Sequence, residues 1–469
     1  MNNHTTWRRW FQFRLRTVLV LLTLSAIPFI WVNRRLQRVR AEKEVIAWID
    51  DLGGSAALEE AETWPDLWFG PRVVSVYLHN AKVSDISALA KLDNLKELVL
   101  NQTEVSDLSP LARLADLNDL NLDGTPVKDI SPLMELTKLT ELRLNHTHVS
   151  DLSPLIGSTN LLVLQVSSTQ VSDLAPLEEL QALRMLTLHN AAVRDISPLA
   201  GLKNLEHLVL FGTKVRDLSP LTGLKNLDTL DLNQTLVSDL SALEELKNLE
   251  AVHLANTKVS DLSSLKRLGA LKELSIRNTP VSDFSPLAKL TTLESLGLDD
   301  TQIDDLTPLV GMKNLDRLFA RNTRVTDLTP LAGLTKLQSL SLSGTPVSDL
   351  SMLTGLARLE YISISDTAVT DLTPLAGLMS LKIFAGNSQV SDLTPLAKLT
   401  SLEFINLDKT KVKDLTPLSG LKKLKRIHLR GTEVTEEQAI KLQRSLPNCT
   451  IVHPGVYLTP RKGGAITRT

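Results

Sequence analysis

The sequence has little of what most enzymes and metal proteins depend on. Its 469 residues include a single cysteine, Cys449, which excludes an intramolecular disulfide and a cysteine-rich metal site. Aromatic residues make up 4% of the chain, and no phosphate-binding loop, nucleophile elbow or His-Glu-x-x-His motif occurs. The 51 Lys and Arg against 53 Asp and Glu leave a net charge of −2, which gives no support for general nucleic-acid binding. We therefore expect no catalysis, no cofactor and no nucleic-acid partner, and Cys449 should pack in a terminal strand rather than act as a reactive thiol.

A repeat of 22 residues fills most of the chain, and a fixed period of this size is typical of a solenoid. Leu98 and Leu100 alternate with outward residues, which predicts a short strand. The Ser109-Pro110 pair predicts one turn of 3₁₀ helix on the opposite side, with Ser109 as its N-cap. One aspartate recurs in each unit: Asp85, Asp107, Asp129, Asp151, Asp173, Asp195, Asp217, Asp239, Asp261, Asp283, Asp305, Asp327, Asp349, Asp371, then Asp392 one residue early, and Asp414.

The apolar positions of one unit can be buried only against neighbouring units, so the fold must be a parallel stack. In the unit used as an example, the residues expected to point inward are Leu95, Leu98, Leu100, Val105, Leu108, Leu111 and Leu114. The stacked aspartates suggest calcium between coils, but each coil offers one carboxylate where calcium takes six to eight oxygens. We favour a structural turn in which each carboxylate accepts hydrogen bonds from nearby backbone amides.

The repeat resembles the leucine-rich repeat family, and its Val-Ser-Asp-Leu-Ser-Pro-Leu-Ala phrase is closest to the short repeats of bacterial internalins. The resemblance extends from Val73 to Val434. It implies an α/β solenoid, a superhelix of about 17 coils with parallel strands on the concave side and short 3₁₀ turns on the convex side. Thr103 and its equivalents stand where such repeats usually carry asparagine. Because a threonine hydroxyl donates to only one carbonyl, we expect a weaker hydrogen-bond ladder.

An apolar run over residues 17–33 follows a basic segment, residues 1–16, and precedes further arginines. It predicts a single transmembrane anchor, with a cleaved signal peptide as the alternative. Arginines on both sides leave the orientation open. The whole arrangement also resembles membrane-anchored leucine-rich repeat proteins of planctomycete-like bacteria. That resemblance bears on topology more than on function.

The remaining segments are expected to close the solenoid at both ends. Residues 34–72 predict a linker helix, stopped by Gly53-Gly54, and an N-terminal cap that includes Trp64, Leu67, Trp68 and Phe69. Residues 73–435 hold the repeats, and residues 436–458 predict a C-terminal cap made of a helix and a last strand. The polar tail, residues 459–469, is expected to be disordered.

Outward strand positions vary from coil to coil, as in a scaffold that presents a tailored surface. Glu97, Asp119 and Glu141 should form one column with Asp123 beside it, an acidic patch for a basic segment. The preferred contact region has Arg and aromatic residues, the usual interface anchors. It comprises Arg317, Phe319 and Arg321 on one strand, with Tyr361 and Phe404 some coils beyond.

Three other features have less specific interpretations. Arg277, Asp299 and Arg321 should form an alternating-charge column, which would only stabilise the sheet surface. Asp231 and His253 should be neighbours on adjacent strands, more typical of a satisfied surface pair than of a metal or acid–base site. A coil one residue short should bulge, with Gly386 where Leu or Ile is usual.

These patterns predict a monomeric, membrane-anchored repeat protein, with its repeats outside the cytoplasm, that binds a protein or a glycan through its repeat sheet. Two alternatives stay open: a cytoplasmic scaffold resembling phosphatase-binding leucine-rich repeat proteins, and a structural envelope component. The similarity to internalins does not carry over host-cell invasion, because the anchor lies at the other end of the chain.

Overall fold

The computed structural model describes residues 29–59, 72–378 and 381–459. The chain divides into two compact units, Met1–Leu183 and Arg184–Thr469, called here the first and the second unit. The sequence predicted one elongated body instead. The repeat pattern does not indicate such a division, because every coil of a solenoid repeats the same contacts with its neighbours.

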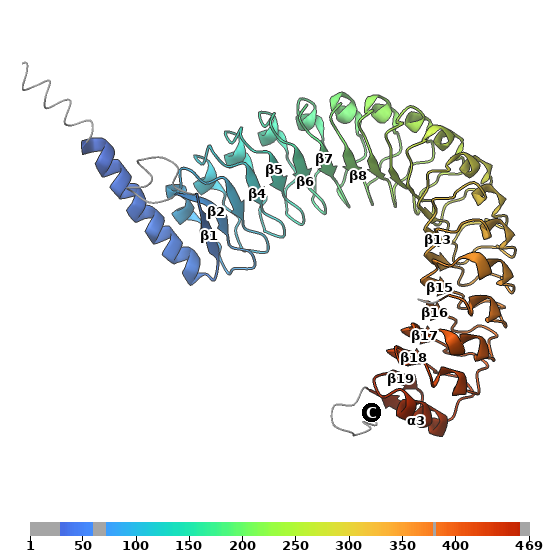
Figure 1. Cartoon of the computed structure of the whole chain (residues 1–469). Helices are drawn as coiled ribbons and strands as arrows, with labels where there is room; N and C mark the ends of the chain where they lie inside the picture. The colour runs from blue at the N-terminus through green and yellow to red at the C-terminus, as the bar shows by residue number, and fades with distance from the viewer. Residues whose placement is uncertain (1–28, 60–71, 379–380, 460–469) are drawn as a thin grey trace, which may run out of the picture. The chain divides into compact units, whose positions relative to one another are not determined.

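The first unit begins with a helix described from residue 29 to residue 51 (Figure 1, blue). The helix runs without a break across residue 33, where the predicted anchor and the predicted linker helix meet, because no Gly or Pro interrupts residues 29–51. Val45 and Ile49 are buried, and the helix ends where Gly53 adopts a φ of +74°. There the Gly54 N–H donates to Ile49 O and the Gly53 N–H to Asp50 O, the Schellman pattern.

The predicted anchor, residues 17–33, lies mostly outside the described residues, as do Trp64 to Phe69 of the expected cap. Among the helices that the structure does describe, none combines the length and apolar character needed to cross a membrane.

Short strands form the sheet of the first unit. β1 (Ser55–Leu58) pairs antiparallel with β2 (Val73–Tyr77), and it was not predicted from the sequence. The parallel strands β2 to β6 then follow in sequence order, each in register with the next. β3 to β6 are Glu97–Val99, Asp119–Asn121, Glu141–Arg143 and Val163–Gln165.

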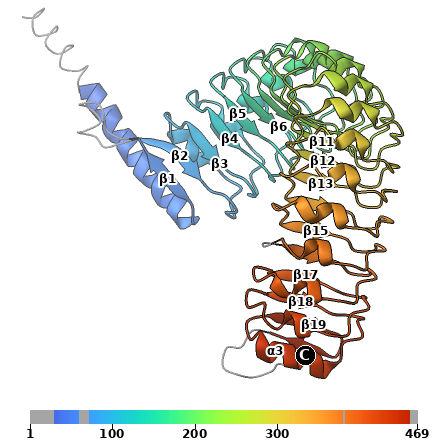
Figure 2. The same cartoon turned by 45° about the vertical axis from the view of Figure 1, so that its right-hand side comes forward.

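The second unit continues the same pattern, with strands along the inner side of its arc and 3₁₀ turns along the outer side (Figures 1 and 2). Its parallel strands are β7 (Met185–Thr187), β8 (His207–Val209), β9 (Thr229–Asp231), β10 (Ala251–His253), β11 (Glu273–Ser275), β12 (Ser295–Gly297), β13 (Arg317–Phe319), β14 (Ser339–Ser341), β15 (Tyr361–Ser363), β16 (Lys382–Phe384), β17 (Phe404–Asn406), β18 (Arg426–His428) and β19 (Thr450–His453). A final strand, β20 (Val456–Leu458), pairs antiparallel with β19.

A 3₁₀ turn follows each strand from β2 to β17, as predicted, whereas β18 is followed by an α-helix. In the first unit these are η1 (Ser87–Lys91), η2 (Ser109–Leu111), η3 (Ser131–Leu133), η4 (Ser153–Leu155) and η5 (Ala175–Leu177). In the second unit they are η6 (Ser197–Gly201), η7 (Ser219–Gly223), η8 (Ser241–Leu243), η9 (Ser263–Arg267), η10 (Ser285–Lys289), η11 (Thr307–Leu309), η12 (Thr329–Leu331), η13 (Ser351–Gly355), η14 (Thr373–Leu375), η15 (Thr394–Lys398) and η16 (Thr416–Leu418).

The core is the column of apolar side chains between strands and 3₁₀ turns. The inward residues predicted for the example coil, from Leu95 to Leu114, are each no more than 1% exposed, which confirms the prediction. Leucine dominates because every coil repeats the same packing position, and each side chain is covered by its equivalents in the coils on either side.

The recurring aspartates hold the turn before each 3₁₀ helix. Asp107 Oδ1 accepts the Ser109 N–H at 2.8 Å, and every equivalent aspartate from Asp85 to Asp414 accepts the amide two residues on at 2.7 to 2.9 Å. The predicted structural role is confirmed. The N-cap assignment of Ser109 is wrong, since Ser109 is the first residue of η2 and its side chain makes no cap hydrogen bond.

The buried threonines stay within their own coil. Thr103 Oγ1 donates to Leu100 O at 2.7 Å, and its equivalents repeat the bond to the carbonyl three residues earlier. Links between coils come instead from outward Asn and Asp side chains, such as Asn233 Oδ1, which accepts the Ala255 N–H at 2.6 Å. The prediction that threonine would give the weaker ladder is consistent with this geometry.

The C-terminal end of the second unit is closed by the helix α3 (Glu436–Ser445) and by β19 and β20. Thr435 and Gln438 form a capping box at the start of α3. Cys449, just before β19, is fully buried, and burial raises the pKa of its thiol to about 12. Cys449 is therefore held as a neutral, packed side chain, as the sequence predicted.

Candidate functional site

Four ring side chains form a continuous run on the outward strand face of the second unit: Tyr361, Phe384, Phe404 and His428. Successive ring centroids lie 5.1, 4.6 and 5.5 Å apart. We call these four residues the aromatic run. The rings come from first and third strand positions in alternation, because Tyr361 is paired with Lys382 and Phe404 with Arg426. Each contact is therefore diagonal across neighbouring strands, a reach that large rings can bridge.

The rings of the aromatic run are half-buried by one another and leave one side open to solvent. Burial lowers the pKa of His428, and the nearby Arg426 and Arg430 lower it further, against the opposing effect of Asp408. The His428 ring is accordingly mostly neutral at pH 7. The four rings in contact form a continuous, largely apolar strip, with neighbouring rings tilted to one another.

The short coil explains how Phe384 reaches the aromatic run. Ile383 pairs with Ile362, only 21 residues earlier, so the missing residue precedes β16, between Leu381 and Ile383. The predicted placement of Gly386 at the core position is wrong, because buried Ala385 takes that position. The predicted bulge is absent, since β15, β16 and β17 stay in unbroken parallel register within the described residues.

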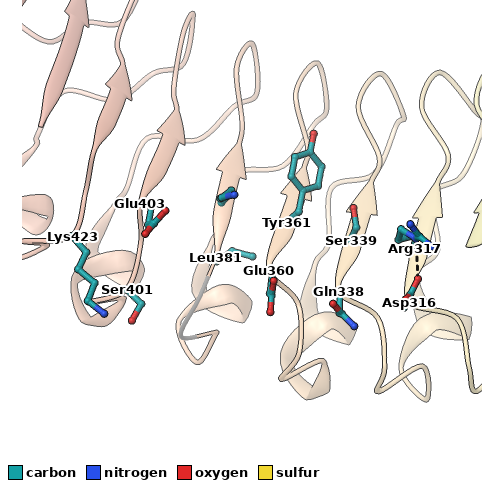
Figure 3. Close-up of a pocket in the computed structure, with 11 residues that line it drawn as sticks. Asp316, Arg317, Gln338, Ser339, Glu360, Tyr361, Leu381, Ser401, Glu403 and Lys423 are labelled. Atoms are coloured by element: carbon teal, nitrogen blue, oxygen red, sulfur yellow. Dashed lines mark hydrogen bonds and ion pairs between the residues drawn. The ribbon is translucent and has the colours of Figure 1, made fainter. Parts of the chain in front are cut away.

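A groove of about 590 Å³ runs beside the aromatic run, where the chain enters strands β13 to β17 (Figure 3). Asp316, Gln338, Glu360 and Glu403 line it from the residues just before those strands. The coil that is one residue short has no equivalent side chain in this row, so Leu381 and Lys382 line the groove there. Figure 3 shows Tyr361 rising above the groove. A partner side chain can thus enter next to the rings.

The other residues of the predicted contact region lie further toward β13. Phe319 does not reach the aromatic run and instead lies under the Arg277 guanidinium, 4.9 Å from ring centroid to Cζ. Arg277 Nε is also 3.3 Å from Asp299 Oδ2, so the predicted charge column is present in part. Arg317 pairs with Asp316 at 3.1 Å. The predicted contact residues therefore fall into two separate groups on the same face. Tyr361 and Phe404 belong to one group, and Arg317, Phe319 and Arg321 to the other.

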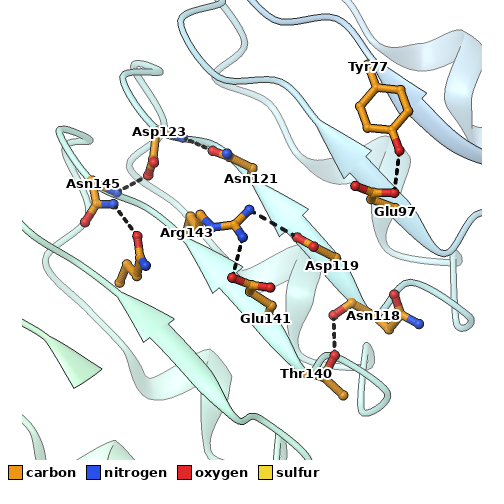
Figure 4. Close-up of polar contacts among 11 residues, drawn as sticks. Tyr77, Glu97, Asn118, Asp119, Asn121, Asp123, Thr140, Glu141, Arg143 and Asn145 are labelled. Carbon is orange, nitrogen blue, oxygen red and sulfur yellow. Dashed lines mark hydrogen bonds and ion pairs between the residues drawn. The ribbon is translucent and has the colours of Figure 1, made fainter. Parts of the chain in front are cut away.

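The predicted acidic patch of the first unit is present as a column but is internally paired (Figure 4). Arg143, at the third position of β5, pairs with Glu141 and lies 3.6 Å from Asp119. Glu97 accepts the Tyr77 hydroxyl at 2.6 Å, which raises the tyrosine pKa. Burial, followed by the charge of Glu141, raises the pKa of Asp119. These contacts occupy the carboxylates that a basic partner would need.

Asp123 belongs to the structure of the sheet. Its Oδ1 accepts the Asn145 N–H at 2.7 Å, a link between neighbouring coils. The Asp123 carboxylate is thus one of the Asn and Asp side chains that link neighbouring coils. This leaves the acidic patch less available to a basic partner.

Asp231 and His253 are neighbours in register, as predicted. His253 lies between Asp231, at 3.9 Å, and Glu273, at 3.5 Å. Its interaction with Asp231 raises the imidazole pKa against the effect of burial. In the part of the chain that the structure describes, no group of three or more His, Cys, Asp or Glu side chains is placed to hold a metal ion.

Comparison with known proteins identifies the type of repeat and structures with a similar fold. A family model of leucine-rich repeats in two copies matches residues 203–245 and 313–355. No curated protein matches the sequence. An internalin of Listeria monocytogenes is 28% identical, over 68% of this chain and 87% of the internalin, with a TM-score of 0.55.

Two further structures share the fold at lower identity. A leucine-rich repeat protein of Leptospira interrogans is 21% identical over 78% of this chain and 92% of its own, with a TM-score of 0.64. A TDR receptor is 18% identical over 81% of this chain and 72% of its own, also with a TM-score of 0.64. The chain therefore contains leucine-rich repeats and is structurally similar to internalins. The likeness to membrane-anchored proteins of planctomycete-like bacteria stays a prediction.

Proposed function

We propose that this chain binds another protein through the outward strand face of its second unit, with the aromatic run as the anchor. The observation that carries the proposal is the contact of four ring side chains in an unbroken run across four neighbouring strands. Aromatic clusters with an open side are typical of the residues that dominate binding energy at interfaces. The adjoining groove offers depth beside the strip, which a rigid solenoid can present without rearrangement.

A glycan could also stack on aromatic rings. The charged side chains around the aromatic run, among them Lys382 and Arg426, favour a protein, because a neutral sugar gives such charges no partner. The mechanism is surface complementarity, and no step of chemistry is required.

Replacing Phe404 by alanine should weaken partner binding by about thirtyfold, since central aromatic anchors contribute about 2 kcal/mol or more. A photo-crosslinking residue at Tyr361 in the full chain, expressed in its native cells, should first give one discrete adduct. The partner so identified is then titrated against wild-type and Phe404→Ala protein by calorimetry. Phe319→Ala, an aromatic truncation on the same face outside the aromatic run, serves as the matched control.

Two outcomes would oppose this proposal. One is an adduct that forms equally when the crosslinker replaces Lys289, on the 3₁₀ side. The other is an affinity that Phe404→Ala leaves within twofold of wild type.

We propose further that residues 17–33 anchor the chain in a membrane with the repeats outside the cytoplasm. The apolar run supports an anchor, and so do Phe29 and Ile30, which are 73% and 52% exposed at the start of the described helix. Protease added to intact or outer-permeabilised cells should remove a C-terminal tag. If the tag survives until the inner membrane is opened, the cytoplasmic scaffold becomes the leading alternative.

A further inference from the structure

The strands around the aromatic run carry cations and rings but no carboxylates. In register, the first positions of β13 to β18 are Arg317, Ser339, Tyr361, Lys382, Phe404 and Arg426. The third positions are Phe319, Ser341, Ser363, Phe384, Asn406 and His428. A strip that alternates rings and cations in this way is suited to a ligand that is both apolar and acidic.

Three cations at the aromatic run make no ion pair within the described residues, although Lys382 is close enough to Glu403 to help lower the pKa of that carboxyl. Lys382, Arg426 and Arg430 have exposed side chains, and none of them has an ion pair with another residue of the described chain. Elsewhere on the strand face, by contrast, Arg143 and Arg277 pair with acidic neighbours. Exposed cations beside an open apolar strip are available to pair with the acidic groups of a partner.

The acidic groups near these cations either contact other residues or lie outside the strands. Glu403 pairs with Lys425 at 2.8 Å. Asp408 accepts the Arg430 N–H at 2.7 Å and lies 3.8 Å from His428. Glu360 is exposed in the groove, before the strand rather than on it. The strip itself stays positive.

Resting on the proposed function, we infer that the partner presents an extended, proline-containing acidic segment to the aromatic run. Lys382 and Arg426 flank Phe404 on the two neighbouring strands, so they are two strand steps apart, about 9.6 Å. A polyproline II segment repeats every three residues with a rise of about 3.1 Å per residue, which brings same-face side chains about 9.3 Å apart. Carboxylates at positions i and i+3 then meet the two cations while the apolar residues between them lie on Phe404 and Phe384.

Single-stranded nucleic acid is the alternative ligand for a surface of rings and cations. The geometry disfavours it, because each ring of the aromatic run is covered in part by the next, at 4.6 to 5.5 Å, so bases could not stack between them. The chain is also acidic overall, with a net charge of −2.

The test uses full-length protein and fluorescein-labelled peptides in an anisotropy titration at low salt. Glu-Pro-Pro-Glu-Pro-Pro-Glu should bind saturably, and the same peptide with Gln for Glu should bind about tenfold more weakly. The double variant Lys382→Glu/Arg426→Glu should lose about tenfold for the acidic peptide and gain affinity for the version with Lys in place of Glu. The matched control, Lys214→Glu/Lys258→Glu, changes charge equally at exposed loop positions and should leave binding unaltered.

Each result separates the partner's chemistry from the proposed function. Equal binding of the Glu and Gln peptides, or binding unaffected by the double variant, overturns the inference. Absence of peptide binding overturns it too, while a Phe404-dependent adduct in cells would still uphold protein binding at this face. A fluorescein-labelled 12-nucleotide thymidine strand that binds and competes with the acidic peptide would replace the inferred partner with nucleic acid.

Discussion

Leu340→Ala is expected to lower the free energy of unfolding of the second unit by about 3 to 5 kcal/mol. Leu340 is the middle residue of β14 and is fully buried, in register between Leu318 and Ile362. Its neighbours are held by strand pairing on both sides, so they cannot move in to fill the space left by the lost methyl groups. The loss should therefore lie in the upper half of the range seen for buried leucines.

The measurement is a urea titration followed by circular dichroism, with Ser339→Ala as the control. Ser339 lies one position earlier on the outward side of the same strand, and its replacement should change stability by no more than about 0.5 kcal/mol. Hydrogen exchange should show the loss of protection centred on β13 to β15, because each coil depends on its nearest neighbours. Equal effects of the two substitutions would mean that the stack is not held by this column.

The fold could be predicted from the sequence because every repeat gives the same answer at each level. The alternation around Leu98 gives a strand, the Ser109-Pro110 pair gives a tight turn, and the fixed period excludes a compact domain. The agreement of many copies outweighs the weakness of each local signal. Prediction failed where the repeat is absent or irregular, at the unpredicted strand β1 and in the short coil.

The aromatic run could be predicted only in part. Tyr361 and Phe404 were recognised as outward rings, but one strand, β16, lies between them. The ring that joins them, Phe384, comes from that strand, in the irregular coil. A one-residue deletion can fall on either side of a strand, and the choice decides whether Phe384 faces the core or the solvent. The signal was present in the 21-residue spacing between Ile362 and Ile383. That spacing becomes informative only when the short coil is aligned with the preceding coil by its strand residues rather than by its turn residues.

The internal pairing of the acidic column was not predicted, for a different reason. Glu97, Asp119 and Glu141 were correctly placed in one column, but the third strand position lies beside that column and carries its own charge. Arg143 occupies that position and reaches back to Asp119, the diagonal neighbour on the previous strand. Long side chains make such diagonal contacts routinely, so charge on a sheet has to be summed over two dimensions.

Acid should destabilise the protein steeply below about pH 4. Hydrogen bonds from the turn amides and hydroxyls lower the pKa of eleven of the recurring aspartates below the ordinary value of 3.8, among them Asp261, Asp283, Asp305 and Asp327. A carboxyl group whose pKa is lower in the folded state stabilises the fold above its unfolded pKa. That contribution is lost as the pH falls through the folded-state pKa. The same loss recurs in coil after coil, because the turn aspartate is repeated along both units.

Thermal unfolding followed by circular dichroism from pH 6 to pH 2 should show a nearly constant melting temperature down to about pH 4 and a continuous fall below it. A variant with asparagine at Asp261, Asp283, Asp305 and Asp327 separates the titration from the turn itself, because the amide oxygen can still accept the backbone N–H but does not ionise. This variant should fold at pH 7 and show a shallower fall in acid. The same fall in wild type and variant would assign the acid sensitivity to other groups.

His253 provides an internal contrast. Its raised pKa stabilises the fold below about pH 6.5, and that contribution is lost as the pH rises through the folded-state pKa. The two effects occupy separate pH ranges, so the titration of His253 does not contribute to the acid limb.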